Sequence, residues 1–267
     1  MAITLSRSAF EKVSQLFHDV SGIRLGEAKH ALVSGRLQKL AYESGERDLE
    51  RYVARLLRGE APPDEMTRVI DRLTTNETYF FREPQHFAHL AERVAQHPRG
   101  EEFLAWSAAS SSGEEAYTVA MVLADSLGTA PWRVIGTDLS TAMVEAARRG
   151  LYPLDRASMV PAATLKRWCL KGHGDYEGQL LVSRDLRARV QFQCANLMQP
   201  LPNLPLFDVI FLRNVLIYFD TPAKAQIVQR VMERLRPDGV LYTGHAESLT
   251  GLGVPLRQLA TAVYTHG

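Results

Sequence analysis

From about residue 100 onward, the chain alternates short apolar segments with amphipathic stretches, and this alternation limits its fold more than any other feature. Strands joined through helices form a largely parallel sheet with helices packed on its faces. The pattern therefore predicts a doubly wound α/β sheet, in which a final segment at 261–266 returns antiparallel at an edge. The other strand-like segments are "EFLAW" at 102–106, "WRVIGT" at 132–137, "RVQFQ" at 189–193, "FDVIFLR" at 207–213 and "GVLYTG" at 239–244.

Two parts of the chain do not follow this alternation. Residues 1–75 place apolar side chains only at helical spacing, in stretches separated by glycine, proline and capping residues, which predicts a small all-helical domain. A linker at 76–90 and a sheet domain at 91–267 are expected to follow. Within the sheet domain, a glycine-rich turn between strand-like segments predicts a small antiparallel β insertion at about 155–190.

Charge and cysteine usage narrow the partners and the compartment. The 267 residues include 31 basic and 30 acidic side chains, so no overall field favours nucleic acid or an anionic membrane. No apolar run approaches the roughly 20 residues that span a bilayer, and no secretory leader is apparent, so a cytoplasmic protein is expected. Cys169 and Cys194 lie far apart without a CxxC or Cys/His pattern, so neither a disulfide nor a metal site is expected.

In such sheets the ligand lies beyond the carboxyl ends of the strands, so the turn after the first strand is informative. There "SAASSSGEEAYTVAMVLA" (107–124) combines small residues, which allow close backbone approach, with Glu114 and Glu115 at the start of a helix. These two carboxylates stand where a pyrophosphate would have to bind. The turn therefore disfavours a dinucleotide and favours a ligand with a ribose and a positive centre.

The turns after the next three strands carry further candidates. Asp138, in "GTDLS" (136–140), can accept both ribose hydroxyls, or it can cap the following helix, a role that Ser140 can also fill. The third strand leads into "CANLMQPLP" (194–202), whose asparagine and leucine can edge an adenine. The fourth leads into "LRNVLIYFD" (212–220), where Tyr218 either lies beside reacting atoms or packs against a helix.

Basic side chains gather on two predicted faces of the helical domain. Lys29, Arg36 and Lys39 share one helix face, and a second stripe follows at i, i+4, i+8 and i+11, comprising Arg47, Arg51, Arg55 and Arg58. One interpretation is a solvated surface balanced by nearby glutamates. The other is a docking surface for an acidic partner.

Five segments together resemble the CheR family of chemotaxis receptor methyltransferases: "TNETYFFRE", "WSAASSSGEEAYTVAM", "TDLS", "FDVIFLRNVLIYFD" and "LRPDGVLYTGHAESL". The resemblance extends over residues 5–265. It implies a class I methyltransferase fold, Rossmann-like with a mostly parallel seven-stranded sheet, a helical N-terminal domain and an antiparallel β-subdomain. The implied reaction moves a methyl group from S-adenosylmethionine to glutamate carboxylates of chemoreceptors, leaving S-adenosylhomocysteine. The loop departs from the family's frequent "ASTGEEPY", because this chain has "SSSGEEAY".

The resemblance also assigns residues. It implies that Arg82 and Tyr218 lie nearest the transferred methyl group. The implied cofactor contacts are Asn76, Thr78, Arg82, Glu115, Asp138, Asn196, Leu197, Arg213 and Asn214. The implied contacts with receptor signalling helices are Arg36, Lys39, Arg47, Arg51, Arg55 and Arg58. Some family members also bind a receptor C-terminal pentapeptide at the β-subdomain, and "KGHGDYEG" (171–178) resembles their turn. A monomer without membrane insertion is expected.

The segment "TNETYFFRE" (75–83) lies where the helical domain meets the sheet domain. Alternation in an extended chain would place Asn76, Thr78 and Arg82 on one face, toward the pocket, while Tyr79 and Phe81 pack the other way. The segment is therefore predicted to be a wall of the active site. Two other functions stay open: methylation of a different substrate, and a non-catalytic module that binds the nucleoside as a signal.

Overall fold

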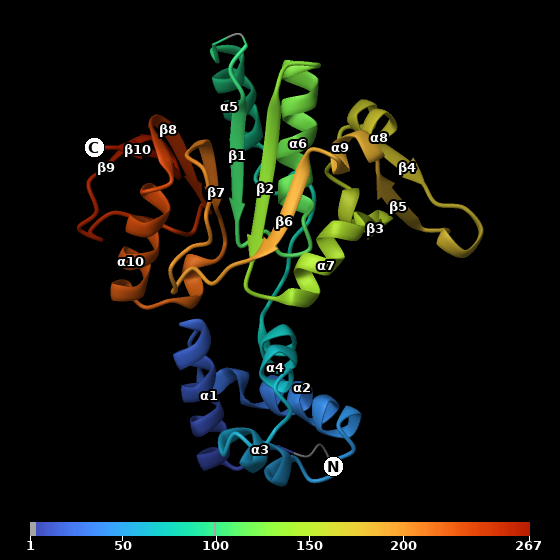
Figure 1. The fold of residues 1–267 in the computed structure, drawn as a ribbon, viewed down its shortest axis with the longest axis vertical. Helices are drawn as coiled ribbons and strands as arrows, with labels where there is room; N and C mark the ends of the chain where they lie inside the picture. Colours follow the sequence, from blue (N-terminus) through green and yellow to red (C-terminus); the bar gives the residue numbers. More distant parts are fainter. Residues whose placement is uncertain (1–3, 99) are drawn as a thin grey trace.

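The computed structural model describes residues 4–98 and 100–267 and consists of a helical domain below a larger sheet domain (Figure 1). Capping residues fix the helix ends in the smaller domain. Ser6 accepts a hydrogen bond from the Ala9 amide, Gly22 ends the first helix with φ 75°, and Asp48 caps the third helix. The helices are α1 (Arg7–Ser21), α2 (His30–Glu43), α3 (Leu49–Leu57) and α4 (Glu65–Leu73), with a 3-10 turn at Glu27–Lys29 before α2.

A seven-stranded sheet forms the second domain, in the order β6-β2-β1-β7-β8-β10-β9. The first five strands in this order are parallel, and β10 runs antiparallel to both of its neighbours. The edge strand is β9 rather than the final segment, so the prediction that residues 261–266 form an edge is wrong, although their antiparallel direction is confirmed. The strands are β1 (Phe103–Ala108), β2 (Trp132–Asp138), β6 (Val190–Cys194), β7 (Phe207–Leu212), β8 (Leu235–Thr243), β9 (Leu256–Ala260) and β10 (Val263–His266).

Helices cover both faces of this sheet, which confirms the doubly wound architecture. Alternate residues of β1 separate the two cores: Phe103 and Ala105 face one layer of helices, and Leu104 and Trp106 face the other. The first layer comprises α5 (Gln85–Ala95), α6 (Glu114–Leu127) and α7 (Thr141–Arg149), and the second contains α10 (Thr221–Met232). The sheet therefore provides a rigid base for the turns at its carboxyl edge.

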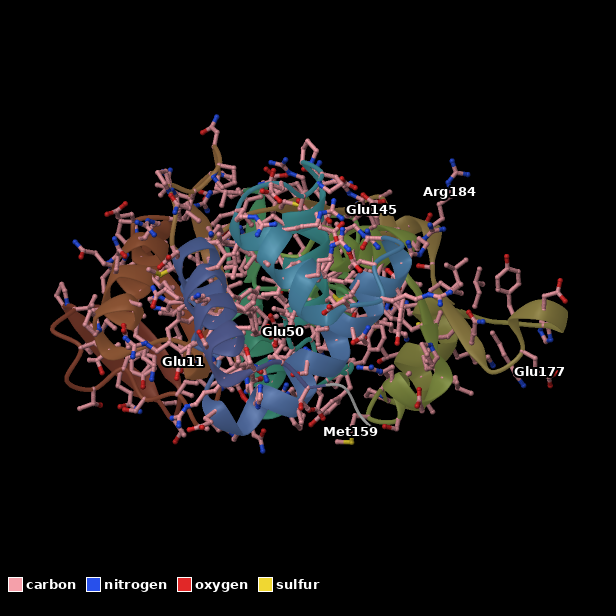
Figure 2. The ribbon with its side chains drawn as sticks, turned by 90° about the horizontal axis from the view of Figure 1, so that it is seen from below. Glu11, Glu50, Glu145, Met159, Glu177 and Arg184 are labelled. Atoms are coloured by element: carbon pink, nitrogen blue, oxygen red, sulfur yellow. The ribbon has the colours of Figure 1, made fainter. Side chains whose placement is uncertain are left out.

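A small antiparallel sheet projects from the side of this domain as a β-subdomain. It begins at Leu151, directly after Gly150 ends α7 with φ 65°, so it starts slightly before the expected 155–190. Figure 2 shows Glu177 at its outer end, far from Glu11 and Glu50 of the helical domain. Its elements are β3 (Leu151–Pro153), α8 (Ala162–Trp168), β4 (Cys169–Lys171) and β5 (Gln179–Val182), followed by α9 (Arg184–Arg187). The strand order is β3-β5-β4, which leaves β4 at an edge.

The helical domain lies against the carboxyl ends of the parallel strands (Figure 1). Asp71 of α4 joins the two domains: Oδ1 accepts a hydrogen bond from Ser140 Oγ at 2.7 Å, and Oδ2 accepts one from Thr141 Oγ1 at 2.8 Å. Helix α5 begins at Gln85, inside the range that the sequence assigned to the linker. No helix of the described chain is both long and apolar enough to cross a bilayer.

Candidate active site

One pocket of about 1080 Å³, a volume that includes the solvent at its mouth, lies between the two domains. It opens at the carboxyl ends of β1 and β7. The strand order reverses between these two strands, and ligands usually bind at such a point in folds of this kind. The sheet domain contributes the turns after its strands. The linker contributes residues 74–79 and 82, and the segment between α1 and α2 contributes Ile23, Leu25 and Lys29.

The backbone is strained in the segments that border this pocket. Six described residues other than glycine have positive φ, and five of them belong to three such segments. They are Phe81 and Glu83 in the linker, Ala109 and Ser111 after β1, and Asn214 after β7. A non-glycine residue with positive φ persists only where its surroundings enforce it, and such residues cluster at functional sites. Together with the pocket, this clustering identifies the site.

Asp138 ends β2 with its carboxylate at the pocket floor. Oδ1 accepts a hydrogen bond from the Ser140 amide at 2.9 Å, and Oδ2 accepts one from the Ser111 amide at 2.8 Å. Burial raises the pKa of Asp138, while these amides stabilise its ionised form. Ser140 caps α7 in its place, so the capping alternative for Asp138 is wrong. Because each carboxylate oxygen keeps an acceptor site, Asp138 can still bind two hydroxyl groups.

Arg213 holds two carboxylates beside the pocket. It is 5% exposed, and its guanidinium contacts Glu115 Oε2 and Glu83 Oε2, each at 3.0 Å. Ser107 Oγ donates a hydrogen bond to the other oxygen of Glu115 at 2.7 Å. Burial raises the pKa of Glu115, whereas Arg213 and the Ser107 hydroxyl stabilise its charged form. Two acidic groups share one cation here, so the cluster leaves net negative charge at the pocket wall.

Two histidines complete this cluster. His86 and His245 lie with Glu83 so that their possible ligand atoms are within 4.8 Å of one another, the composition of a metal site. The Arg213 guanidinium, however, already supplies a positive charge 3.0 Å from the Glu83 oxygen that faces both rings. Burial lowers the pKa of His86 to about 4, so its ring is neutral near pH 7. We therefore assign the three residues to the Arg213 charge network rather than to a metal.

The linker lines one wall of the pocket, as its sequence predicted, but the side chains near Tyr79 are not buried in the predicted pattern. Asn76 and Thr78 face inward and line the pocket. Tyr79 is 38% exposed instead of packing inside, and Phe80 takes the buried place against Tyr152 of the β-subdomain. The expectation that Tyr79 packs inside is therefore wrong, although Thr78, Tyr79 and Phe80 still alternate between buried and exposed before Phe81 adopts positive φ. The Arg82 guanidinium then lies over the Tyr79 ring, 5.8 Å from its centroid.

Tyr218 lies in the pocket wall near two cationic side chains. Lys29 Nζ lies 5.1 Å from the centroid of its ring, and Arg82 is close enough to lower the pKa of its hydroxyl. Burial outweighs that effect and raises the pKa of Tyr218, so the phenol keeps its proton at neutral pH. Arg82 is anchored by a hydrogen bond of 3.0 Å from Nη1 to the Glu77 carbonyl. This part of the pocket therefore suits an anionic group.

Three other predicted contacts line the pocket while also serving the structure. Asn196 Nδ2 donates a hydrogen bond of 2.8 Å to the carbonyl of Val20 in α1, and its Oδ1 accepts one from the Met198 amide. Leu197 is buried in the core beneath the sheet. Asn214 has φ 57° and directs Nδ2 to Glu83 Oε1 at 3.4 Å. A ligand can therefore contact only those atoms of the three side chains that are not already engaged in these hydrogen bonds or in the core.

Apart from Lys29, the predicted basic residues of the helical domain lie outside the pocket. Arg36 donates hydrogen bonds to the carbonyls of Leu73 and Thr74, while Lys39 is exposed. Helix α3 spans only Leu49–Leu57, so Arg47 and Arg58 lie beyond its ends and the predicted stripe is shorter than expected. Arg51 pairs with Glu46 at 3.4 Å and Arg58 with Glu60 at 2.8 Å. Helix α3 also lies at the end of its domain remote from the sheet (Figure 1).

Sequence reasoning did not single out several residues of the site. Lys29 was assigned to a basic face only. Nothing in the neighbouring sequence indicates that it contacts Tyr218, which lies 189 positions later in the chain. Glu83 and His86 continue the linker segment and were not considered. Glu247 follows the carboxyl end of β8, and the rule that ligands lie beyond strand ends applies to it equally. Applied to β8, that rule would have indicated Glu247 from the sequence.

Comparisons with known proteins agree with this geometry. Residues 76–264 match the family model described as CheR methyltransferase, SAM binding domain, and residues 8–74 match the CheR methyltransferase all-alpha domain. A chemotaxis protein methyltransferase of Salmonella typhimurium is 39% identical over 94% of this chain and 87% of its own. One from Escherichia coli has the same values. Chemotaxis protein methyltransferase 2 of Pseudomonas aeruginosa is 35% identical over 97% of this chain and 93% of its own.

Proposed function

The chain belongs to the CheR family of methyltransferases that use S-adenosylmethionine, and from this premise we propose that it methylates glutamate side chains of chemoreceptors. The products would be glutamate methyl esters and S-adenosylhomocysteine. The observation that carries the choice of a carboxylate is that two cations, Lys29 and Arg82, lie near Tyr218 in the pocket lining, beside the acidic residues of the same pocket.

The pocket residues fit the cofactor by charge and hydrogen bonding. Asp138 keeps acceptor sites for two ribose hydroxyls, as its amide contacts leave them open. Glu83 and Glu115 outnumber their shared Arg213, and this excess negative charge suits a ligand with an ammonium group and a sulfonium centre. When bound, S-adenosylmethionine supplies an electrophilic methyl group whose departure leaves a neutral thioether.

The protein's own residues have to bind and align the acceptor. A glutamate side chain is ionised at neutral pH and is already nucleophilic, so no general base is needed. We propose that Arg82 orients the acceptor carboxylate through charge-assisted hydrogen bonds. Tyr218, still protonated, would pack beside the reacting atoms and limit access of water. Alignment of this kind can remove several kcal/mol from the barrier, about 7–11 in the best intramolecular systems.

One assay tests the reaction. The protein would be incubated with methyl-labelled S-adenosylmethionine and receptor signalling domains, and the washed receptor would then be treated with base. A carboxyl ester releases its label as volatile methanol, whereas methylated nitrogen or carbon releases none. Label that stays on the receptor would contradict an ester, and no transfer despite cofactor binding would support the non-catalytic alternative. A receptor with its methylated glutamates replaced by alanine is the control.

Docking of the receptor would use the exposed basic side chains of the helical domain. Methylation regions are acidic helices, and we propose that Lys39 and the pair Arg51 and Arg55 contact them, with Arg36, Arg47 and Arg58 nearby. Most of these side chains are exposed, so their contribution should fall as salt rises. The working unit proposed is a cytoplasmic monomer, which sedimentation at the assay concentration would check.

A second receptor contact is proposed at the β-subdomain. Strand β4 ends the order β3-β5-β4, so one side of it is open to an added peptide strand, and Leu170 on it is 59% exposed. The following turn depends on Gly172, because a Cβ there would lie 2.0 Å from the carbonyl oxygen of Tyr176. Titration with a receptor C-terminal pentapeptide should show binding that Leu170→Asp weakens. No binding at high micromolar peptide would contradict this contact.

A further inference from the structure

Glu247 lies in the loop after β8 and is only 5% exposed, although its side chain is acidic. Its carboxylate accepts hydrogen bonds from three backbone amides. Oε2 accepts from Asn214 at 2.6 Å and from Gly244 at 2.8 Å, and Oε1 accepts from Ile217 at 3.2 Å. The side chain therefore binds the main chain of another loop, 30 or more positions earlier in the sequence.

The segment that Glu247 binds has little regular structure of its own. Asn214 has φ 57°, Val215 has φ −121° and ψ −33°, and a single 3-10 turn at Leu216–Tyr218 follows. Amides in such a segment lack the ladder partners of a strand and must find acceptors elsewhere. Glu247 supplies acceptors on both sides of Val215. It thereby fixes the turn that carries Tyr218.

The loop that carries Glu247 is itself anchored and shaped for this contact. The Glu247 amide donates to the Gly244 carbonyl at 2.8 Å, and its carbonyl accepts a hydrogen bond from Thr243 Oγ1 at 3.1 Å. Gly244 allows the close approach, because a Cβ there would lie 2.7 Å from Glu247 Oε2 and 2.6 Å from Asn214 Nδ2. A rigid base at the end of β8 thus holds a less regular segment beside the pocket.

We propose that Glu247 is a positioning residue for methyl transfer, which sets the place of Tyr218 and Asn214 through the backbone between them. The proposal rests on the proposed function, because alignment of the acceptor carboxylate is what the protein must supply. A displacement of about 1 Å in an aligned site can cost on the order of 100-fold in rate. Glu247 need not touch the substrate to have such an effect.

The test uses Glu247→Gln, which has nearly the same shape. Glutamine keeps one acceptor oxygen, but its NH2 group must then face a backbone N–H, so part of the clamp is lost. The control is Asp208→Asn near the other end of β7, where a buried carboxylate accepts hydrogen bonds from the Leu104 amide and from the Arg236 guanidinium, each at 2.7 Å. We expect a decrease in melting temperature for both variants, at least as large in Asp208→Asn, and a decrease in kcat of about 10- to 100-fold for Glu247→Gln alone. The KM for the cofactor should change less than about three-fold, and Glu247→Asp should recover part of kcat.

Hydrogen exchange gives a readout that does not require turnover. Amides in residues 213–219 should exchange faster in Glu247→Gln than in the wild type and in Asp208→Asn. Wild-type kcat or unchanged exchange in a folded Glu247→Gln would overturn the proposal. If the wild type releases no methanol from receptor, the proposed function fails, while the exchange comparison still decides whether Glu247 holds the loop.

Discussion

The charged side chains beside the pocket are buried, whereas those on α3 and at its end are exposed to solvent. Arg213 is buried between Glu83 and Glu115, and each contact measures 3.0 Å. Arg51 and Arg58 have side chains 73% and 58% exposed, and each pairs with a glutamate close to it in sequence. Buried ion pairs are costly to break, whereas exposed pairs contribute little to stability. Arginines in the two regions should therefore contribute differently to stability and function, and the following experiments test that difference.

The largest effect is expected at Arg213. In Arg213→Met, Glu83 and Glu115 lose their shared cation in a buried place, so the free energy of unfolding should fall by about 3–5 kcal/mol. Arg58→Met, at the exposed pair with Glu60, should leave the free energy of unfolding nearly unchanged, because solvent screens such pairs. Denaturant unfolding measures both changes. Equal losses in the two variants would erase the contrast between buried and exposed charges.

A smaller loss, confined to catalysis, is expected at Arg82. Arg82→Ala removes the charge proposed to orient the acceptor carboxylate, and kcat should fall by 10- to 100-fold, since hydrogen bonds between charged groups contribute about 1.5–3 kcal/mol. The affinity for the cofactor, measured by calorimetry, should stay within about five-fold of the wild-type value, because a residue that acts on the acceptor lowers kcat without a matching change in cofactor binding. Arg82→Lys should retain part of the rate. Full turnover in a folded Arg82→Ala would remove this residue from the mechanism.

The next effect concerns affinity. Asp138→Asn turns one acceptor into a donor that faces a backbone amide, so the Kd for S-adenosylhomocysteine should rise about 10-fold, the effect of one unsatisfied polar group. Ser140→Ala is the control, because it removes the α7 cap, worth about 1 kcal/mol of stability, and the hydroxyl bond to Asp71, but keeps the backbone amide that Asp138 accepts. An unchanged Kd in Asp138→Asn would mean that this carboxylate does not bind ribose.

The smallest effect is expected on α3. Reversing two charges in Arg51→Glu/Arg55→Glu should raise the KM for receptor by about two- to five-fold at low salt, and less at high salt, because exposed charges are screened within about 10 Å at 0.1 M. Arg184→Glu, at the edge of the molecule and away from Glu50 in Figure 2, should have no such effect. Methylation of receptor unchanged by the double variant would leave α3 as a solvated surface only.

The sequence predicted those parts of the molecule that depend on local pattern. Alternation of strands and helices led to the sheet, and the rule for strand ends led to Asp138 and Glu115, which line the pocket. Alternation in the linker was right for Asn76 and Thr78 and wrong for Tyr79. Alternation tells which residues share a face but not what covers that face, and the face of Tyr79 is left partly open to solvent.

Contacts between distant segments were beyond such reasoning. Nothing in the neighbourhood of Lys29 indicates that it lies over the Tyr218 ring. Arg36 looked like a free surface cation, yet it donates to the carbonyls that end α4. Glu247 was not assigned a role from the sequence, and only the fold brings it to Asn214. In each case a polar side chain found a partner that sequence spacing does not encode.

Asp71 has a consequence for how such proteins can be recombined. Its carboxylate joins α4 to the start of α7, next to the strand end that carries Asp138, while Asn196 reaches back to the carbonyl of Val20. Exchanging helical domains between relatives would therefore also exchange residues that line the pocket between the two domains. A chimera should keep its donor affinity only when the residues on both sides of this seam are transplanted together.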